Sequence, residues 1–158
     1  MSDRAVTLRL ARPDDARAMA EMSRQFIEAG LAWRYSPARI GALMRQRETT
    51  SLVAGDGAGL QGFSIMEFGD ERAHLVLLCV QPALRRSGIG RGMVEWLVAS
   101  AQVAGMAAIR LELRADNAGA QAFYTALGFS EDGLVPGYYD GRITARRMVR
   151  RLRDAAFG

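Results

Sequence analysis

The feature that most constrains this chain is a basic, glycine-bearing turn between a strand-like and a helix-like segment. Residues 75–80 form a continuous apolar run, and apolar side chains recur at a helical period from Gly88 onward. Between them lies the sequence Arg85-Arg86-Ser87-Gly88-Ile89-Gly90-Arg91. A strand, a glycine turn and a helix start bring free backbone N–H groups, a helix dipole and arginine charge to one point, as in pyrophosphate sites. The sequence therefore predicts that this turn binds a phosphorylated ligand.

Length and composition favour a single globular domain over residues 1–158. With 49% hydrophobic and 24% charged residues, a chain of 158 residues can bury one core. No apolar run reaches the roughly 20 residues that span a bilayer, and the N-terminal residues do not lead into a signal-peptide segment. We therefore expect a cytoplasmic protein without a membrane partner.

The reactive residue types narrow the chemistry. A single cysteine, Cys79, cannot form an internal disulfide, and a single histidine, His74, leaves no metal-binding cluster of ordinary spacing, so we expect no metal. The net charge is +4 and all 21 basic residues are arginine, which suits bidentate contacts to phosphate or carboxylate. The charge alone would also fit nucleic acid. Because basic and aromatic residues are not interleaved as in single-strand binders, we expect no nucleic-acid partner.

Hydrophobic periodicity predicts a mixed α/β sheet. The segments predicted as strands are 6–11, 52–54, 62–68, 73–80, 107–114, a short one after Gly128, and about 142–152, with Gly55 to Gly59 as a hairpin connection. The predicted helices run from Pro13 to Gly30, from Pro37 over Ile40, Leu43 and Met44, from Gly88 to Gly105, and from Asn117 to Leu127.

Two motifs in this order resemble those of a known superfamily. They are Arg85-x-x-Gly88-x-Gly90 and, about 25 residues later, Asn117-x-x-Ala120-x-x-Phe123-Tyr124-x-x-x-Gly128-Phe129. Together they resemble the two acetyl-coenzyme A motifs of the GNAT N-acetyltransferase superfamily, and the pair is far more specific than either motif alone. Residues 111–129, followed by Gly137-Tyr138-Tyr139, look most like the ribosomal-protein alanine N-acetyltransferase branch.

The resemblance implies a fold and a cofactor. The fold would be a mixed, mostly antiparallel sheet of about six or seven strands flanked by about four helices, and the cofactor would be acetyl-CoA. The turn would hold the pyrophosphate, and the strand end before it would pair with the pantetheine amides like an added strand. On the later helix, steps of three and four residues place a stripe of side chains toward the thioester. The residues so assigned to the cofactor are Leu78, Cys79, Val80, Arg85, Arg86, Ser87, Gly88, Ile89, Gly90, Arg91, Asn117, Ala120 and Tyr124.

The implied reaction is direct attack of an amine on acetyl-CoA with loss of the CoA thiolate. Deprotonating the amine costs about 4 to 5 kcal/mol at pH 7 for an alkylamine and about 1 kcal/mol for a peptide α-amine. The resemblance makes Glu112 the general base and Tyr124 the general acid, because a phenol can hydrogen-bond to the departing thiolate. Glu71 and a water chain are alternative bases. Glu112 also fits a solvent-facing carboxylate stabilised by Arg110 and Arg114.

The sequence says less about the amine that accepts the acetyl group than about the cofactor. Trp33 and Tyr35, between the first two predicted helices, and the pair Tyr138 and Tyr139 are either substrate contacts or residues that pin loops. The branch carries a longer loop and an acidic pair after its paired tyrosines, whereas this chain has an arginine-bearing segment at 140–147. Arginine there weakens the case for a cationic peptide terminus, so a small amine or an amino acid is an equal candidate beside a peptide or protein amine.

Three further questions stay open at this point. His74 is either a titrating group at a strand edge or a structural residue. Cys79 is most simply a small buried apolar residue, because nothing near it in the sequence activates a thiol. The number of subunits is undetermined, a homodimer included, and a non-catalytic module that binds or senses acyl-CoA is the alternative to an enzyme.

Overall fold

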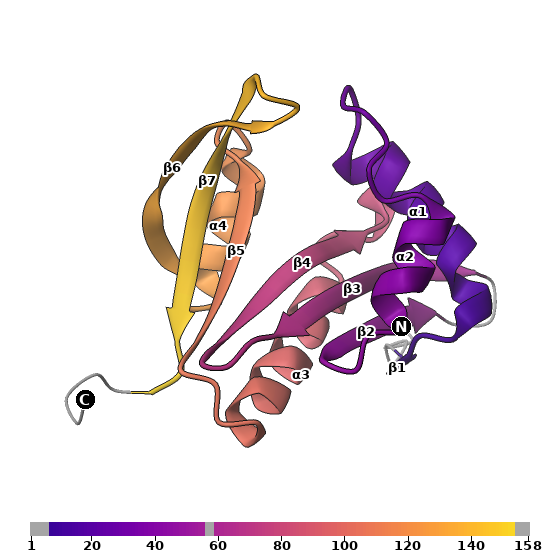
Figure 1. Ribbon diagram of the computed structural model, residues 1–158, viewed down its shortest axis with the longest axis horizontal. Coiled ribbons are helices and arrows are strands. Elements are labelled where there is room, and N and C mark those ends of the chain that lie inside the picture. The colour runs from indigo at the N-terminus through magenta and orange to yellow at the C-terminus, as the bar shows by residue number, and fades with distance from the viewer. Residues whose placement is uncertain (1–6, 56–58, 154–158) are drawn as a thin grey trace. The chain divides into compact units, whose positions relative to one another are not determined.

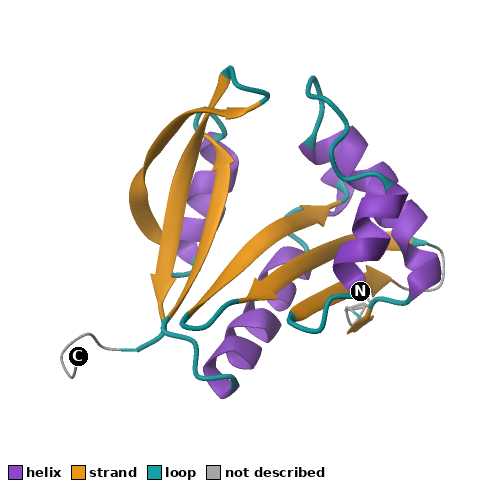
Figure 2. Cartoon of the chain, viewed as in Figure 1, coloured by secondary structure: helices purple, strands orange, loops and turns teal. Residues whose placement is uncertain are grey.

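The computed structural model describes residues 7–55 and 59–153, and this part folds into a seven-stranded sheet with four α-helices (Figures 1 and 2). The strands are β1 (Leu8–Leu10), β2 (Thr49–Gly55), β3 (Leu60–Phe68), β4 (Arg72–Val80), β5 (Ala108–Arg114), β6 (Ser130–Tyr139) and β7 (Ile143–Arg151). The helices are α1 (Ala16–Met22), α2 (Pro37–Met44), α3 (Ile89–Val103) and α4 (Ala118–Ala126).

The strand order in the sheet is β1-β2-β3-β4-β5-β7-β6. Strand β1 pairs antiparallel with β2, and β7 pairs antiparallel with both β5 and β6. Strands β4 and β5 run parallel, with Ala73 opposite Ile109. A parallel neighbour needs a crossover connection, and α3 supplies it. The predicted mixed, mostly antiparallel sheet with about four helices is confirmed.

Two compact units divide the chain. The first comprises residues up to 66 together with 77–96, and the second comprises 67–76 together with the residues from 97 onward. The single domain over residues 1–158 stays a prediction. No helix among the described residues is both long and apolar enough to cross a bilayer. Val6 of the predicted first strand and residues 56–58 of the predicted hairpin connection lie outside the described part.

The core of the first unit brings β2, β4 and α3 together. Ala54, Val80, Ile89 and Met93 form one buried cluster. Gly62 shows how closely the backbones approach beside it, because a β-carbon there would lie 2.8 Å from the carbonyl oxygen of Cys79. Only glycine leaves room for that contact. The close packing fixes the end of β4 against the start of α3, where the basic turn lies.

The first predicted helix is in fact three consecutive helical segments. A 3-10 turn at Pro13–Asp15 leads into α1, and a π-helical segment follows at Ser23–Ile27. The wider π turn lets the backbone N–H of Glu28 donate to the carbonyl of Ser23 at 2.7 Å. Gly30, with φ +78°, lies where the sequence predicts the helix to stop. The helical segments cover 13–27 and end three residues before Gly30, and the π segment has no signature in the periodicity.

In the second unit, α4 is defined at both ends as the sequence predicts. The Asn117 side-chain oxygen accepts from the backbone N–H of Ala120 at 3.0 Å, which caps the N-terminus. Gly128, with φ +91°, follows the last turn. Arg150 of β7 donates to the carbonyl oxygen of Leu127 at 2.9 Å, so the C-terminal end of α4 is tied to the sheet.

Strand β6 is longer than predicted. The sequence predicts only a short strand after Gly128, and Pro136 and Gly137, which are residue types typical of turns, lie further along. The structure instead continues β6 to Tyr139 with two register shifts, one of them spanning Pro136. Strand β6 is last in the strand order, and an edge strand tolerates a missing N–H donor and a bulge. The extension places Tyr138 on the sheet.

Candidate active site

The basic turn combines two residues of left-handed backbone conformation with the start of a helix. Arg86 has φ +68° and Gly88 φ +91°, and both values lie in the left-handed region. The N–H of Gly92 donates to the Gly88 carbonyl at 2.9 Å, whereas the N–H groups of the residues between them, in the first turn of α3, have no acceptor within the helix. A β-carbon on Gly88 would meet no heavy atom within 4 Å. Free donors beside open space fit a pyrophosphate.

The end of β4 carries the residues assigned to the pantetheine. Cys79 is buried, with its sulfur 4.0 Å from the carbonyl oxygen of Met22. Burial raises the pKa of the Cys79 thiol to about 12, although the positive charge of Arg85 opposes the rise. The residue therefore stays a neutral thiol, which confirms that Cys79 is a small buried apolar residue. Its backbone remains the part that is suited to a cofactor.

Tyr124 is held by aromatic neighbours on α4 and just after it. Its ring meets Phe123 edge-on, with centroids 5.0 Å apart, and meets Phe129 edge-on at 5.5 Å. Its exposed fraction is 8%. Two neighbouring rings therefore cover the ring of Tyr124. A buried phenol with a fixed ring is well suited to hydrogen-bond one particular atom.

Glu112 lies at the centre of a polar cluster on the second unit. Its Oε1 accepts from Nε2 of His74 at 2.7 Å and from the hydroxyl of Tyr138 at 3.2 Å. Its Oε2 accepts from Nη1 of Arg110 and from Nε of Arg147, both at 2.9 Å. The side chain of Glu112 is 4% exposed. The expected pairing with Arg110 is confirmed, whereas the carboxylate does not face solvent.

The register of the sheet explains this cluster. Arg147 on β7 is the antiparallel partner of Glu112 on β5. His74 on β4 is the parallel partner of Arg110, two residues before Glu112 on the same side of β5. Strand β6 adds Tyr138. We call these five residues the Glu112 cluster: His74, Arg110, Glu112, Tyr138 and Arg147.

The cluster holds Glu112 as an anion. Burial by itself raises the pKa of Glu112, but hydrogen bonds from His74 and Arg147 together with the charge of Arg110 outweigh it and lower that pKa to about 2. The hydrogen bond to Glu112 likewise raises the pKa of Arg147. A carboxylate with such a low pKa takes a proton reluctantly.

The first pair of candidate acceptor contacts lies on a loop that a buried carboxylate shapes. Oε1 of Glu28 accepts from the backbone N–H groups of Arg34 at 2.6 Å and Tyr35 at 3.2 Å. The guanidinium of Arg24 lies 5.0 Å from the ring centroid of Trp33. The sequence analysis does not single out Glu28, because no pattern marks a carboxylate that folds back on the following loop.

The second pair, Tyr138 and Tyr139, meets edge-on with centroids 4.9 Å apart. Tyr138 joins the Glu112 cluster through its hydroxyl, which the sequence does not predict. Glu71, the alternative base, is exposed between β3 and β4, and its backbone oxygen accepts from the N–H of Ala107. Its side chain is not among those that meet Glu112 in the described residues.

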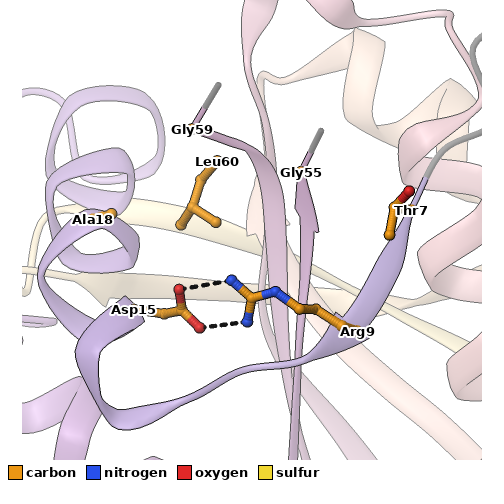
Figure 3. A pocket seen from close by; sticks show the side chains of 7 residues that line it. All are labelled: Thr7, Arg9, Asp15, Ala18, Gly55, Gly59 and Leu60. Carbon is orange, nitrogen blue, oxygen red and sulfur yellow. Dashed lines mark hydrogen bonds and ion pairs between the residues drawn. The ribbon is translucent and has the colours of Figure 1, made fainter. Parts of the chain in front are cut away.

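A separate hollow in the first unit contains none of the predicted site residues (Figure 3). Inside it, Arg9 donates two hydrogen bonds to Asp15, at 2.7 and 3.0 Å, which lower the pKa of that carboxyl. Its charged groups are therefore paired with each other. The lining residues are Thr7, Arg9, Asp15, Ala18, Gly55, Gly59 and Leu60.

The fold and the two motifs define a class of protein. The chain belongs to the Acetyltransferase (GNAT) family, whose family model matches residues 15–129. The match includes the basic turn, His74, Glu112 and the whole of α4. Members of this family are N-acetyltransferases that use acetyl-CoA as the acetyl donor. The resemblance inferred from the motifs is confirmed.

The chain is similar to particular members of this family. It is 37% identical over 93 residues to the [Ribosomal protein bS18]-alanine N-acetyltransferase of Escherichia coli strain K12, which covers 57% of this chain and 63% of the relative. The solved structure of the Escherichia coli ribosomal-protein-S18-alanine N-acetyltransferase superposes with a TM-score of 0.80 at 26% identity, covering 96% of this chain and 97% of that one. Ard1 from Thermoplasma volcanium superposes with a TM-score of 0.82 at 25% identity, covering 95% and 99%.

Proposed function

We propose that this chain is an acetyl-CoA-dependent N-acetyltransferase that moves an acetyl group to a primary amine. The observation that carries the proposal is the basic turn, whose free N–H groups and open space at Gly88 lie inside the segment that matches the family. The relatives are transferases, which favours catalysis over a module that only binds or senses acyl-CoA.

One set of residues binds the cofactor, and another set takes part in the transfer. The turn from Arg86 to Arg91, with Arg85 before it, holds the pyrophosphate through backbone N–H groups and guanidinium charge. The backbone of residues 78–80 pairs with the pantetheine amides. Asn117 caps α4, and Ala120 on that helix has a small side chain that leaves room for the thioester arm. Bound acetyl-CoA supplies the chemistry, namely an acyl carbon activated by its thiolate leaving group.

Tyr124 and the Glu112 cluster take the two proton-transfer roles. Tyr124 donates a hydrogen bond to the departing sulfur, and its fixed, buried ring makes that donor pre-organised. Glu112 assists the deprotonation of the amine. Its negative charge, held inside a cluster with two guanidinium groups, attracts a cationic amine less strongly than an isolated carboxylate would.

Two classes of acceptor follow from this chemistry. One class is a protein N-terminus, because a relative acts on the alanine of a ribosomal protein. We propose that this chain works in the cytoplasm, where ribosomal proteins are made. The arginines of the cluster favour instead an amine that also carries a carboxylate, such as an amino acid. We expect Trp33, Tyr35, Tyr138 and Tyr139 to contact whichever acceptor binds.

Thermal unfolding with acetyl-CoA tests the donor. At 100 times Kd, a ligand that binds only the folded state adds about 2.7 kcal/mol, or about 5 to 10 °C in Tm for a chain of this size. NADH, which has a pyrophosphate but no pantetheine, is the matched control and should shift Tm less. A Tm unchanged by excess acetyl-CoA would contradict the proposal.

An amine panel then tests the transfer. The panel contains an alanine-initiated peptide, free amino acids and simple alkylamines, with release of free CoA as the readout. Replacing Tyr124→Phe should slow transfer about tenfold, because one hydrogen bond to the leaving group is lost, while acetyl-CoA affinity stays within about twofold. Equal turnover of the variant would remove the acid role, and binding without transfer to any amine would favour the sensing module.

A further inference from the structure

We propose that His74 takes the proton from the acceptor amine and that Glu112 is the residue that positions its imidazole. This inference rests on the proposed N-acetyltransferase function and identifies the proton acceptor within it. It departs from the role that family resemblance gives to Glu112. The reason lies in how the hydrogen-bonding capacity of the Glu112 cluster is used.

The carboxylate of Glu112 has no capacity left for an amine. A carboxylate offers about four lone-pair sites on its two oxygens. In the structure, four donors occupy them, two on Oε1 from His74 and Tyr138 and two on Oε2 from Arg110 and Arg147. The side chain is also 4% exposed. An amine could reach Glu112 only by displacing a charged or hydrogen-bonded partner.

The imidazole of His74 has the opposite properties. Because an ionised carboxylate only accepts hydrogen bonds, the contact of 2.7 Å requires that Nε2 of His74 carry the proton and donate to Glu112. In the neutral ring the lone pair then lies on Nδ1, and the described part of the chain supplies no hydrogen-bond partner for that atom. The side chain is 22% exposed. His74 therefore presents a free, oriented and accessible base.

Charged groups from two neighbouring strands face the imidazole of His74. From β5, the Glu112 carboxylate contacts Nε2 of His74, and Arg110 on the same strand contributes a positive charge. From β7, Arg147 adds a second positive charge, and from β6 Tyr138 adds a hydroxyl that donates to Glu112. The charged partners in the cluster are thus one carboxylate and two guanidinium groups. The same arrangement of a carboxylate behind a histidine orients the general base of hydrolytic triads.

The transfer step balances as follows. Nδ1 of His74 accepts one proton from the acceptor ammonium, and the amine lone pair then forms the C–N bond to the acetyl carbon. The C–S bond breaks, and its electron pair leaves on the sulfur, to which Tyr124 donates a hydrogen bond. The newly acylated nitrogen loses its second proton to water, which leaves a neutral amide and the CoA thiolate. The imidazolium of His74 returns its proton to water through its exposed edge. No oxidant or further reactant is required.

The tautomer can be tested directly, because His74 is the only histidine in the chain. In untagged protein labelled with nitrogen-15, imidazole NMR reports this one ring. We expect the neutral form to carry its proton on Nε2, and we expect Glu112→Gln to weaken that preference. A neutral ring protonated on Nδ1 would overturn the proposal, and this result does not depend on acetyl-CoA or on any acceptor.

Kinetics test the proton transfer. His74→Gln keeps an N–H donor near the position of Nε2 but has no basic nitrogen. We expect kcat for an alanine-initiated peptide to fall about 100-fold, the rate to rise with pH as the free amine becomes more abundant, and acetyl-CoA affinity to stay unchanged. The loss should shrink for hydroxylamine, a much less basic amine. Arg72→Gln, an exposed position on the same strand, is the matched control.

The outcomes separate the inference from the proposed function. If His74→Gln keeps wild-type turnover and pH dependence, His74 serves only the structure, and the proposal is overturned. If Glu112→Gln abolishes transfer while His74→Gln does not, Glu112 itself is the base. If the wild type neither binds acetyl-CoA nor acetylates any amine, the proposed function fails, and the NMR result alone then describes the His74–Glu112 pair.

Discussion

The basic turn and the Glu112 cluster use hydrogen bonds in opposite ways. In the turn, backbone donors at the start of α3 lack acceptors within the helix, and the space beside Gly88 is empty. In the cluster, every lone-pair site of a buried carboxylate is filled by a side chain of the same protein. The donors of the turn can therefore bind a ligand, whereas the acceptor sites of the carboxylate are already satisfied within the protein.

This difference distinguishes a binding site from a positioning device. A site that binds an anion must leave donors unpaired until the anion arrives, because each donor satisfied internally is lost to the ligand. A residue that orients a catalytic group must itself be held, and its bonds should not change during the reaction. The turn fits the first description and Glu112 the second. In the cluster, Nδ1 of His74 resembles the turn, because the described residues supply no hydrogen-bond partner for it.

The largest expected effect comes from filling the space in the turn. In Gly88→Val, a branched side chain occupies the open volume and strains a backbone with φ +91°. We expect acetyl-CoA to bind about 100-fold more weakly by calorimetry, equivalent to about 2.7 kcal/mol. Gly105→Val is the control, because Gly105 has φ +77° and is equally uncrowded. Similar loss of affinity in both variants would mean that the turn has no special role.

A second, smaller effect, on stability, should follow from removing the central carboxylate of the Glu112 cluster. Glu112→Ala leaves two guanidinium groups and an imidazole without their shared acceptor, and we expect it to cost about 2 kcal/mol of unfolding free energy at pH 7. Urea denaturation measures this. Glu131→Ala, which removes an ion pair with Arg146 on a side chain that is 46% exposed, is the control and should cost from about 0 to 1 kcal/mol.

The contribution of Glu112 should depend on pH with a definite sign. Its pKa is about 2 in the folded protein against an ordinary value of 4.5, so the unfolded chain binds a proton first as the pH falls. The stabilisation is therefore complete above about pH 4.5 and disappears as the pH drops toward 2. The stability difference between wild type and Glu112→Ala should narrow over that range. A difference that stays constant down to pH 3 would show that Glu112 is not held as an anion.

How far the sequence predicts each region depends on how its residues are distributed along the chain. The turn is contiguous, so glycines, arginines and flanking periodicity reveal it without any tertiary information. The cluster unites residues separated by 38 positions for His74 and Glu112, and by 35 for Arg147 and Glu112. Such pairs depend on strand order and register, which periodicity does not determine. His74 therefore had two interpretations from sequence, and the register decides that it pairs with Glu112.

The fold shows the same division. Strands, helices and their caps follow from local signals such as Asn117 before α4. The length of β6 does not, because Pro136 marks a turn in isolation and is accepted only since β6 lies at the sheet edge. The burial of Tyr124 is likewise tertiary, since Phe129 covers the ring after the chain has turned at Gly128. Local chemistry predicts the elements, and their neighbours decide the environment of each side chain.

The smallest expected effect tests whether the cluster needs all four of its donors. Tyr138 is 37% exposed and gives Glu112 its longest hydrogen bond, at 3.2 Å. We expect Tyr138→Phe to cost about 0.5 to 1 kcal/mol, because the ring and its edge contact with Tyr139 remain. A double-mutant cycle with Glu112→Gln isolates the hydrogen bond, and its coupling energy should be of the same size. A coupling energy near zero would mean that one lone-pair site on Oε1 is open to water. Glu112 would then have hydrogen-bonding capacity left, as the turn has, and the difference between the two regions would be contradicted.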